Sequence, residues 1–193
     1  MACVDALFQQ GWYRYAGHRP SPHCDARPEG MRAELLVLHN ISLPAGKFGT
    51  ACVDALFLGN LDTQNQPEFA ALQGLRVSAH FFIRRDGSLL QYVSCDQRAW
   101  HAGASRFHGR SHCNDFSIGI ELEGTDSVPF EPAQYDSLAA LVGALLQAYP
   151  IQSLAGHSDI APGRKTDPGP CFDWPALHRA SALALSSFPA LES

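Results

Sequence analysis

Hydrophobic and polar residues alternate along the first two thirds of the chain in patterns that predict strands. The run ELLVLHN at residues 34–40 is mostly apolar and ends in a polar pair, as a short buried strand would. Residues 76–93 form two runs rich in β-branched and aromatic residues around Asp86-Gly87, a dipeptide that favours a tight hairpin turn. Residues 115–124 carry an apolar side chain at every second position, which predicts a strand with one buried face.

The last third of the chain shows helical periodicity. Pro132 suits the first turn of a helix, and apolar residues then recur with a period of 3.6 until Pro150. These residues are Leu138, Leu141, Val142, Leu145, Leu146 and Tyr149. Asp173 and Pro175 indicate the start of a last helix that runs to about Leu185. Because strands and helices mix without strict alternation, we expect an α/β (α+β) fold with a central mixed β-sheet flanked by helices.

Length, charge and cysteine usage narrow the classes of function. At 193 residues the chain is expected to form one domain, residues 1–193, with a sizeable core. Its net charge of −5, without a run of Lys or Arg, argues against nucleic acid or an anionic membrane as partner. The chain shows no span of ~18–20 apolar residues, no secretory signal and nothing that points to an obligate protein partner. Its six scattered cysteines, without CxxC spacing, are therefore expected to be reduced thiols in a cytoplasmic protein.

The heptapeptide ACVDALF occurs twice, at residues 2–8 and 51–57. The residues that follow the two copies are unrelated, so the duplication does not indicate a repeat architecture. We interpret the first copy as part of an N-terminal extension over residues 1–10 and assign it no function.

Residues able to bind a metal or to transfer protons collect after predicted strands and in one loop. They are His39 and Asn40 after the first strand, Glu121 in IELEG, and His157, Lys165 and Asp167 in the loop 156–170. Two neutral imidazoles and a carboxylate suit a catalytic zinc, because three protein ligands leave a fourth position for water. A metal between the His and the Asp of the loop would also fix a Gly- and Pro-rich segment with little apolar surface. The residue types alone do not establish a zinc site, because in a chain with nine histidines some will lie near carboxylates by chance.

Five segments of the chain match the order and the approximate spacing of a known enzyme family. The segments are LLVLHNISLP, VSAHFFIRRDGSLLQYV, RAWHAG, CNDFSIGIELEGT and GHSDIAPGRKTDPGP. Together they closely resemble the AmpD-type N-acetylmuramoyl-L-alanine amidases, cytoplasmic zinc enzymes that act on 1,6-anhydro-muropeptides during cell-wall recycling. The resemblance runs from about Gly11 to Trp174, and the wider family includes phage amidases and the peptidoglycan recognition proteins.

The resemblance implies a single zinc amidase domain that holds one Zn²⁺ per chain. It implies that His39, His157 and Asp167 bind the zinc, and that Glu121 and Lys165 are the catalytic pair beside it. These roles agree with general chemistry, because zinc lowers the pKa of bound water toward ~7, a carboxylate can relay the proton and an ammonium can stabilise an oxyanion. The expected reaction is hydrolysis of the amide between the lactyl group of 1,6-anhydro-N-acetylmuramic acid and L-Ala, with a small muropeptide as substrate.

Substrate contacts are expected from Asn40, Arg76, Trp100 and Arg110. Arg76 resembles a family arginine that meets stem-peptide carboxylates, a role that suits a bidentate guanidinium. Trp100 lies in a segment that is near the substrate in the family, with simple packing as the alternative. Relatives commonly have the sequence GRERCND where this chain has GRSHCND. His112 therefore replaces an arginine that is a candidate to bind a substrate carboxylate, while Arg110 remains.

Several other polar residues receive structural interpretations. His80, within a strand, is interpreted as a core histidine or a substrate contact and not as a ligand. Arg84 and Arg85 are predicted to be solvated charges next to the hairpin turn. The segment Cys113, Asn114, Asp115 is interpreted as structural. Four histidines are predicted to lie at the surface without a role: His18, His23, His108 and His178.

Two other classes of function stand as alternatives. The first is a non-catalytic muropeptide-binding module of the same fold, but such proteins typically lose a ligand, whereas all five metal-binding and catalytic residues are present here. The second is an Fe(II) oxygenase, because His157 and Asp159 with the distal His178 mimic a facial triad. That fold needs several more strands around its ligands than this chain provides.

Overall fold

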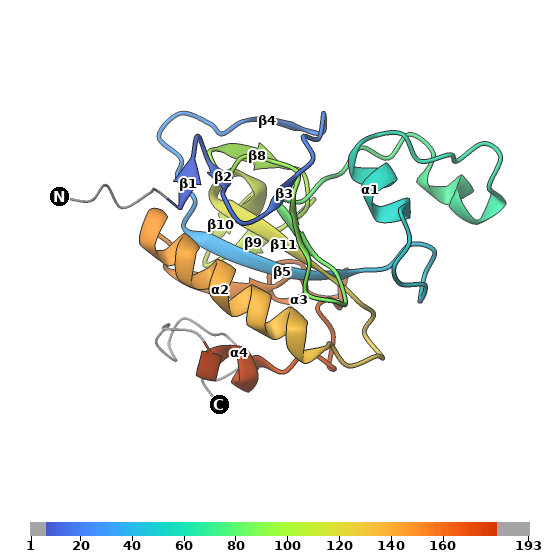
Figure 1. Cartoon of the computed structure of the whole chain (residues 1–193). Coiled ribbons are helices and arrows are strands. Elements are labelled where there is room, and N and C mark those ends of the chain that lie inside the picture. Colours follow the sequence, from blue (N-terminus) through green and yellow to red (C-terminus); the bar gives the residue numbers. More distant parts are fainter. Residues whose placement is uncertain (1–6, 181–193) are drawn as a thin grey trace.

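The computed structural model describes residues 7–180, and these residues build a six-stranded mixed sheet (Figure 1). The strands lie in the order β12-β5-β11-β6-β7-β3. Their bounds are β3 (Gly17–His18), β5 (Leu35–Ile41), β6 (Phe81–Ile83), β7 (Leu89–Gln91), β11 (Ser117–Glu123) and β12 (Ser153–Gly156). Neighbouring strands from β12 to β6 are parallel, β7 is antiparallel to β6, and β3 is parallel to β7. The sheet is therefore mixed, as predicted.

Short elements surround this sheet. Three two-stranded ladders pair β1 (Phe8–Gln9) with β2 (Trp12–Tyr13), β4 (Cys24–Ala26) with β8 (Gln97–Ala99), and β9 (Arg106–Phe107) with β10 (Arg110–Ser111). The helices are α1 (Cys52–Phe57), α2 (Pro132–Ala148), α3 (His157–Ile160) and α4 (Trp174–Ala180), with 3-10 helices η1 (Pro67–Leu72) and η2 (Cys113–Phe116). Between residues 7 and 180, none of these helices is long and apolar enough to cross a membrane.

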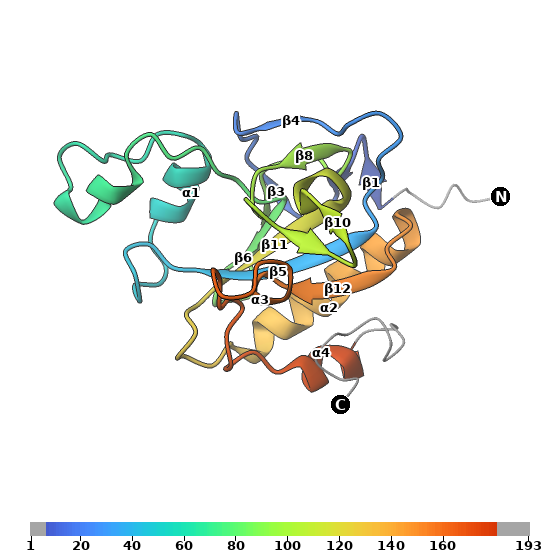
Figure 2. The ribbon, with the colours of Figure 1, turned by 180° about the vertical axis from the view of Figure 1, so that it is seen from behind.

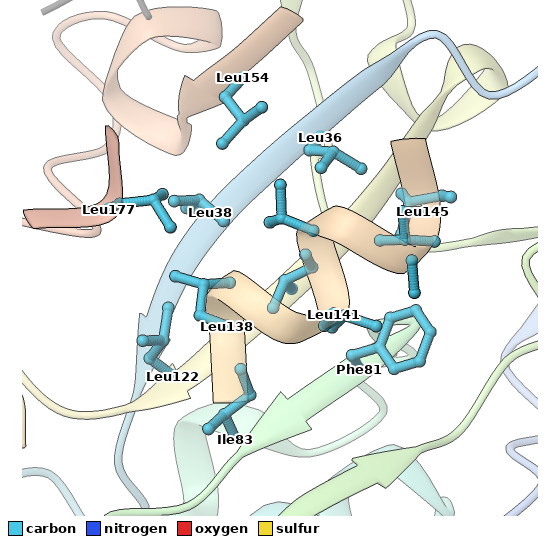
Figure 3. Close-up of a cluster of buried hydrophobic side chains, with 14 of the residues drawn as sticks. Leu36, Leu38, Phe81, Ile83, Leu122, Leu138, Leu141, Leu145, Leu154 and Leu177 are labelled. Atoms are coloured by element: carbon cyan, nitrogen blue, oxygen red, sulfur yellow. The ribbon is translucent and has the colours of Figure 1, made fainter. Parts of the chain in front are cut away.

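The largest hydrophobic cluster lies between the sheet and α2 (Figure 3). Leu138, Leu141 and Leu145 from α2 pack onto Leu36 and Leu38 of β5 and onto residues of the neighbouring strands. Leu177 of α4 joins the same cluster, so α2 and α4 cover one face of the sheet. The view from behind shows α3 and β10 on the opposite face (Figure 2), where a second cluster joins β5 to α3 and η2.

The predicted elements are confirmed in type and position. The run 34–40 forms β5, residues 76–93 contain the β6–β7 hairpin, and the long helix begins at Pro132. Asp173 precedes α4, whose predicted end at Leu185 lies outside the described residues. The prediction for residues 115–124 is wrong in one respect, because all seven residues of β11 are buried. A central parallel strand is covered on both faces, which the alternating pattern alone did not indicate.

Two predictions of exposed charge or surface position are also wrong. Arg84 forms an ion pair with the buried Asp54, and Arg85 forms one with Glu131, so neither is simply solvated. His23 is only 6% exposed, since its ring stacks on Trp100 and its Nδ1 lies 3.0 Å from the carbonyl oxygen of Val77. The partners lie far away in sequence, which is why local context misled the prediction.

The two copies of the heptapeptide fold differently where both are described. The second copy forms α1, while most of the first copy lies outside the described residues and its last residue, Phe8, begins β1. Phe8 packs against Tyr13 and Tyr149. Tertiary context therefore decides the conformation of these residues. The interpretation of residues 1–10 as an extension stays a prediction.

Candidate metal centre

Parallel pairing of β5 and β11 brings two candidate residues of the site together. In this register Glu121 is the direct partner of His39, near the carboxyl ends of both strands. On the other side of β5, β12 leads directly into α3, whose first residue is His157. Ligand-binding residues of parallel sheets commonly lie at the carboxyl ends of the strands. The topology thus brings His39 to side chains that lie more than 80 residues later in the sequence.

Three donor atoms form a nearly equilateral triangle at this edge. The Nδ1 of His39 lies 2.9 Å from the Nδ1 of His157 and 3.1 Å from the Oδ2 of Asp167. The third side, from His157 Nδ1 to Asp167 Oδ2, is 3.0 Å. Ligands ~2.0–2.1 Å from a tetrahedral zinc stand roughly 3.3 Å apart. The two imidazoles and the carboxylate therefore fit a small tetrahedral cation.

Hydrogen bonds behind the two histidines fix which nitrogen faces the triangle. The Nε2 of His157 lies 3.2 Å from the carbonyl oxygen of Ala102, which can only accept, so this nitrogen carries the hydrogen and Nδ1 keeps its lone pair. The Nε2 of His39 lies 2.9 Å from the Nδ1 of His101. Partners of this kind orient the ligands of protein metal sites.

The protonation states in the triangle also suit metal binding. Burial lowers the pKa of His39 to about 4, so its ring is neutral at physiological pH. Burial alone would raise the pKa of Asp167, but the interactions with His157 and His39 outweigh it and lower that pKa. Neutral imidazoles and an ionised carboxylate are the forms that coordinate a metal, since protons compete with the ion for the same lone pairs.

Glu121 presents a carboxyl group without a partner beside the triangle. Its side chain is buried, and its Oε2 has no hydrogen-bond partner among the described residues. Burial raises the pKa of Glu121 well above its ordinary value, Asp167 adds to this effect, and Lys165 opposes it. Lys165 is exposed and lines the same cavity. A buried polar atom left unpaired is rare in native proteins, so the position of this carboxyl group requires an explanation.

Both polar and apolar side chains line the cavity that contains these groups. Its volume is about 280 Å³, and the three donors, Glu121 and Lys165 all line it. Leu56 and Phe57 of α1 and Leu72 of η1 contribute to the apolar wall. Such a pocket, apolar with a few convergent polar groups, is typical of small-molecule sites.

The residues expected to contact substrate are only partly brought together. Asn40 and Trp100 line the cavity, and Asn40 donates hydrogen bonds to Asp126 Oδ1 (2.7 Å) and to the Pro168 carbonyl (3.1 Å). Arg76 lies over the Trp100 ring, with its guanidinium carbon 5.3 Å from the ring centroid, and lines an adjoining cavity of about 310 Å³.

Arg110 is placed elsewhere. It forms an ion pair with Glu34, its guanidinium carbon lies 3.9 Å from the centre of the Phe116 ring, and it lines a third cavity. His112, which replaces a family arginine, is exposed in a left-handed backbone conformation with φ of 61°. The structure therefore does not bring Arg110 to the triangle.

The loop at residues 156–170 has more anchors than its sequence indicated. Ile160 is buried in the cluster shared with β5, and Pro168 is buried as well. The backbone of Ser158 donates to the Asp167 carbonyl (2.9 Å), and Arg164 donates to two carbonyls of the 101–104 segment. These protein contacts hold the loop, and the contribution of a metal to its position stays a prediction.

Sequence reasoning missed His101, although it names the segment that contains it. His101 lies between His39 and Ser117, with its Nε2 3.1 Å from the Ser117 hydroxyl. Its signal was the position of a histidine next to Trp100 together with a glycine, Gly119, in a strand interior. His80, by contrast, is a core histidine, since its Nδ1 accepts from the Gly119 N–H and its Nε2 faces the Gln97 carbonyl.

The facial-triad alternative does not fit the observed contacts. Asp159 accepts a hydrogen bond from the backbone N–H of Gly156, and His157 meets Asp167 instead. His178 lies on α4, which packs against α2 on the other face of the sheet. The donor set is therefore His39, His157 and Asp167.

Comparison with known proteins connects this site to one family. The profile described as N-acetylmuramoyl-L-alanine amidase (Amidase_2) matches residues 29–170. The 1,6-anhydro-N-acetylmuramyl-L-alanine amidase AmpD of Escherichia coli (strain K12) is 58% identical over 170 residues, which cover 87% of this chain and 93% of that protein. AmpD of Haemophilus influenzae is 51% identical over 157 residues, 80% of this chain and 85% of that protein.

Solved structures of similar proteins share the fold. A crystal structure of a selenomethionine derivative of AmpD superposes with a TM-score of 0.88 at 54% identity, covering 91% of this chain and 99% of that chain. The Escherichia coli amidase AmiD, solved with anhydro-N-acetylmuramic acid-L-Ala-D-γ-Glu-L-Lys, gives a TM-score of 0.58 at 30% identity. That match covers 80% of this chain and 60% of AmiD.

Proposed function

The chain belongs to the N-acetylmuramoyl-L-alanine amidase family, and from this premise we propose that it is an amidase of peptidoglycan recycling. It hydrolyses the amide bond between the lactyl group of 1,6-anhydro-N-acetylmuramic acid and the L-Ala of the stem peptide. The observation that carries the proposal is the donor triangle with the unpaired Glu121 carboxyl in the same cavity. The identity to the AmpD enzymes supports the substrate class.

We propose that the metal is zinc and that His39, His157 and Asp167 hold it. The mixed nitrogen and oxygen donor set, the donor spacing and the buried position fit this ion. When bound, Zn²⁺ supplies a water of lowered pKa and polarises a carbonyl oxygen. The family is zinc-dependent in general, which agrees with the donor set.

Glu121 is proposed to move the proton. Its Oε2 has no hydrogen-bond partner within residues 7–180, so it is free to accept a proton from the attacking water and to return it to the leaving amine. Burial raises the pKa of Glu121 well above its ordinary value, which makes the carboxylate a stronger base. A carboxylate with the same burial but two hydrogen-bond donors would be a poorer base.

Lys165 is proposed to stabilise the oxyanion that forms when the lactyl carbonyl is attacked. Its side chain is exposed and lines the cavity, so the ammonium can approach a bound substrate. One such electrostatic contact typically contributes ~10²–10³ in rate. Replacing Lys165 with alanine should reduce turnover by this factor and leave the three metal ligands in place.

Trp100 and Asn40 are proposed to contact the substrate in the cavity, and Arg76 to meet a carboxylate of the stem peptide from the adjoining cavity. The two cavities share Leu56, Leu72 and Leu75 as lining residues, which makes one extended site possible. Arg110 was expected to take part, but its ion pair with Glu34 gives it another partner. We propose that the substrate is a recycled fragment in the cytoplasm.

A direct experiment tests the proposal. Purified protein is incubated with anhydroMurNAc-tripeptide, with and without chelator, and the products are identified by mass spectrometry beside a metal analysis of the protein. We expect about one zinc per chain, release of the free sugar and the intact peptide, and loss of activity on chelation. Asp167→Ala should lower metal content and activity together.

Other outcomes would identify the alternatives. Tight binding of the muropeptide without cleavage by the zinc-loaded protein would indicate a binding module. Release of D-Ala or of shortened peptides would indicate a carboxypeptidase. Full activity of a metal-free preparation would falsify the metal mechanism.

A further inference from the structure

His101 occupies an unusual position directly behind a proposed metal ligand. Its Nδ1 is 2.9 Å from the Nε2 of His39, and the two rings meet edge to face with centroids 5.0 Å apart. On its far side, the Nε2 of His101 is 3.1 Å from the Oγ of Ser117. A ligand histidine more often donates to a carboxylate, a carbonyl or a water. A second imidazole in this place therefore needs an explanation.

The directions of these hydrogen bonds follow from one another. If the Nδ1 of His39 uses its lone pair toward the donor triangle, its Nε2 must carry the hydrogen and donate to the Nδ1 of His101. A neutral His101 then carries its own hydrogen on Nε2 and donates it to the Ser117 hydroxyl. The chain His39, His101, Ser117 can therefore hold each ring in the tautomer that leaves the Nδ1 of His39 available to a metal. With the opposite directions, the Ser117 hydroxyl would donate to His101 and the Nδ1 of His39 would carry a hydrogen, so a bound metal selects the first arrangement.

The strand beside His101 is shaped to receive its ring. A Cβ on Gly119 would lie 2.4 Å from a ring carbon of His101, so any larger residue there would displace the imidazole. Ser117 and Gly119 are two residues apart on β11 and face the same side as Glu121. One strand therefore supplies the space for His101, its hydrogen-bond acceptor and the proposed proton carrier.

The backbone around His101 is held from the opposite side. The side-chain oxygen of Asn114 accepts hydrogen bonds from the N–H groups of His101 (3.2 Å) and Ala102 (2.8 Å). The buried guanidinium of Arg27 in turn donates to the carbonyls of Asn114 (3.1 Å) and Ser117 (2.9 Å). Because Ala102 also accepts from His157, the same segment supports both histidines of the triangle.

We propose that His101 is a positioning residue for the metal ligand His39. Its Nδ1 accepts the hydrogen bond that holds the His39 ring in the tautomer and orientation required for metal binding. Ser117 keeps His101 in place as its hydrogen-bond acceptor, and Gly119 leaves the space for its ring. The inference rests on the proposed metal site and adds a residue to it. It assigns His101 to metal affinity and not to contact with the substrate.

The test compares zinc affinity in variants matched in size. His101→Phe fills the space but offers no acceptor, His101→Gln offers a carbonyl oxygen, and Ser117→Ala removes the second acceptor. Zinc affinity is measured by competition with a chromophoric chelator, and the Co²⁺-substituted proteins are compared by absorption spectroscopy. Loss of such an outer partner costs ~10–100-fold in metal affinity, so we expect this loss in His101→Phe, a smaller loss in Ser117→Ala, and partial rescue in His101→Gln.

His80→Asn serves as the control. The His80 ring lies 5.8 Å from the His101 ring and forms no hydrogen bond with any of the three proposed ligands. It should leave zinc affinity and the Co²⁺ spectrum unchanged, while thermal unfolding of the metal-free proteins records effects on folding alone. Gly119→Ala should weaken zinc binding, because the added methyl group displaces the His101 ring.

The outcomes separate the inference from the metal site. If the wild type binds zinc and His101→Phe binds it as tightly with the same Co²⁺ spectrum, the inference is wrong and the metal site stands. If His101→Gln loses as much affinity as His101→Phe, the acceptor is not the relevant feature and the inference also fails. If the wild type binds no zinc, the metal site itself is wrong. If His101→Phe does not fold, unchanged zinc affinities in Ser117→Ala and Gly119→Ala overturn the inference.

Discussion

The two faces of β11 show how one strand serves stability and chemistry. Ile118, Ile120 and Leu122 belong to the main hydrophobic cluster, to which α2 also contributes. Leu122 is labelled within this cluster in Figure 3. The alternate residues of β11 face the opposite side of the sheet, and they are Ser117, Gly119, Glu121 and Glu123. The residues of both faces are buried, but only the first face is apolar. Burial alone therefore does not tell a core residue from a site residue; the partners of the polar atoms do.

The two glutamates on the polar face sharpen this difference. Glu123 is buried with both oxygens satisfied, since Oε1 accepts from the Gly49 N–H (2.5 Å) and Oε2 from the Arg85 N–H (3.1 Å). Glu121, two residues earlier, leaves its Oε2 unpaired in the cavity. A satisfied carboxylate fixes loops in place, whereas an unsatisfied one costs stability and is retained where function requires it.

The largest effect is expected when the unpaired carboxyl is changed. Glu121→Gln keeps the shape of the side chain but cannot relay a proton, so kcat should fall by ~10²–10⁴ with zinc content unchanged. Steady-state kinetics and metal analysis of the same preparation measure both quantities. The matched control is Glu123→Gln, which should lower the free energy of unfolding and leave the chemical step intact. Turnover of Glu121→Gln near the wild-type rate would show that another group carries the proton.

The apolar face should respond in the opposite way. Leu141 of α2 is fully buried in the main cluster, and Leu141→Ala should lower the free energy of unfolding by ~2–5 kcal/mol through lost burial and a residual cavity. Turnover per folded molecule should stay the same, because no residue of α2 lines the cavity. Denaturant titration measures the loss, and Leu146→Ala on the same helix, where the side chain is only partly buried, should cost less. A strong loss of kcat in folded Leu141→Ala would contradict the separation of the two faces.

The apolar face was predictable from sequence for a physical reason. Side chains that pack on α2 recur with the period of a helix or a strand, so local pattern identifies α2, β5 and the hairpin. The same pattern predicted only one buried face for β11, because Ser, Gly and Glu at alternate positions are typical of a solvent-exposed face. The cover over that face comes from residues such as His101 and Asn114, whose approach depends on tertiary structure.

The polar face could be predicted only in part. His39 and His157 are 118 residues apart in sequence, and their donor atoms are 2.9 Å apart in the structure. No spacing rule gives this distance, so the ligand set followed from the family resemblance. Ion pairs likewise set the environments of two arginines, since Arg84 pairs with Asp54 and Arg110 pairs with Glu34. Neither partner could be predicted from the residues next to the arginine in sequence.

Acid should destabilise the polar side through His80. Burial, reinforced by Arg27, lowers the pKa of His80 to about 3, whereas an unfolded histidine titrates near 6.5. Between these values the unfolded chain binds a proton that the folded chain does not. The stability contribution is therefore complete above pH 6.5 and is lost as the pH falls, by about 2 kcal/mol at pH 5.

The measurement compares the free energies of unfolding of the chelator-treated protein at pH 7 and pH 5. His80→Asn removes this group, and its Oδ1 can still accept from the Gly119 N–H, so its loss of stability between the two pH values should be smaller by that amount. Burial also lowers the pKa of His39, to about 4, which adds loss in the same direction in both proteins. Equal pH dependence in the wild type and His80→Asn would show that His80 titrates normally in the folded state.

The smallest effect is expected at the outer end of the apolar face, where α4 closes over the main cluster. The Oδ1 of Asp173 accepts a hydrogen bond from the Ala176 N–H (2.8 Å), so it caps the helix that carries the buried Leu177. Asp173→Ala should lower the free energy of unfolding by ~1 kcal/mol, as loss of an N-cap usually does, and Asp173→Asn should retain most of the stability because it keeps an acceptor. The exposed contact with Arg179, at 3.9 Å, should add little. Denaturant titration of the three proteins measures these differences, and kcat should be equal in all of them because the cap lies on the face that does not build the cavity. A fall in kcat larger than the fall in stability would mean that α4 acts on the site through the sheet.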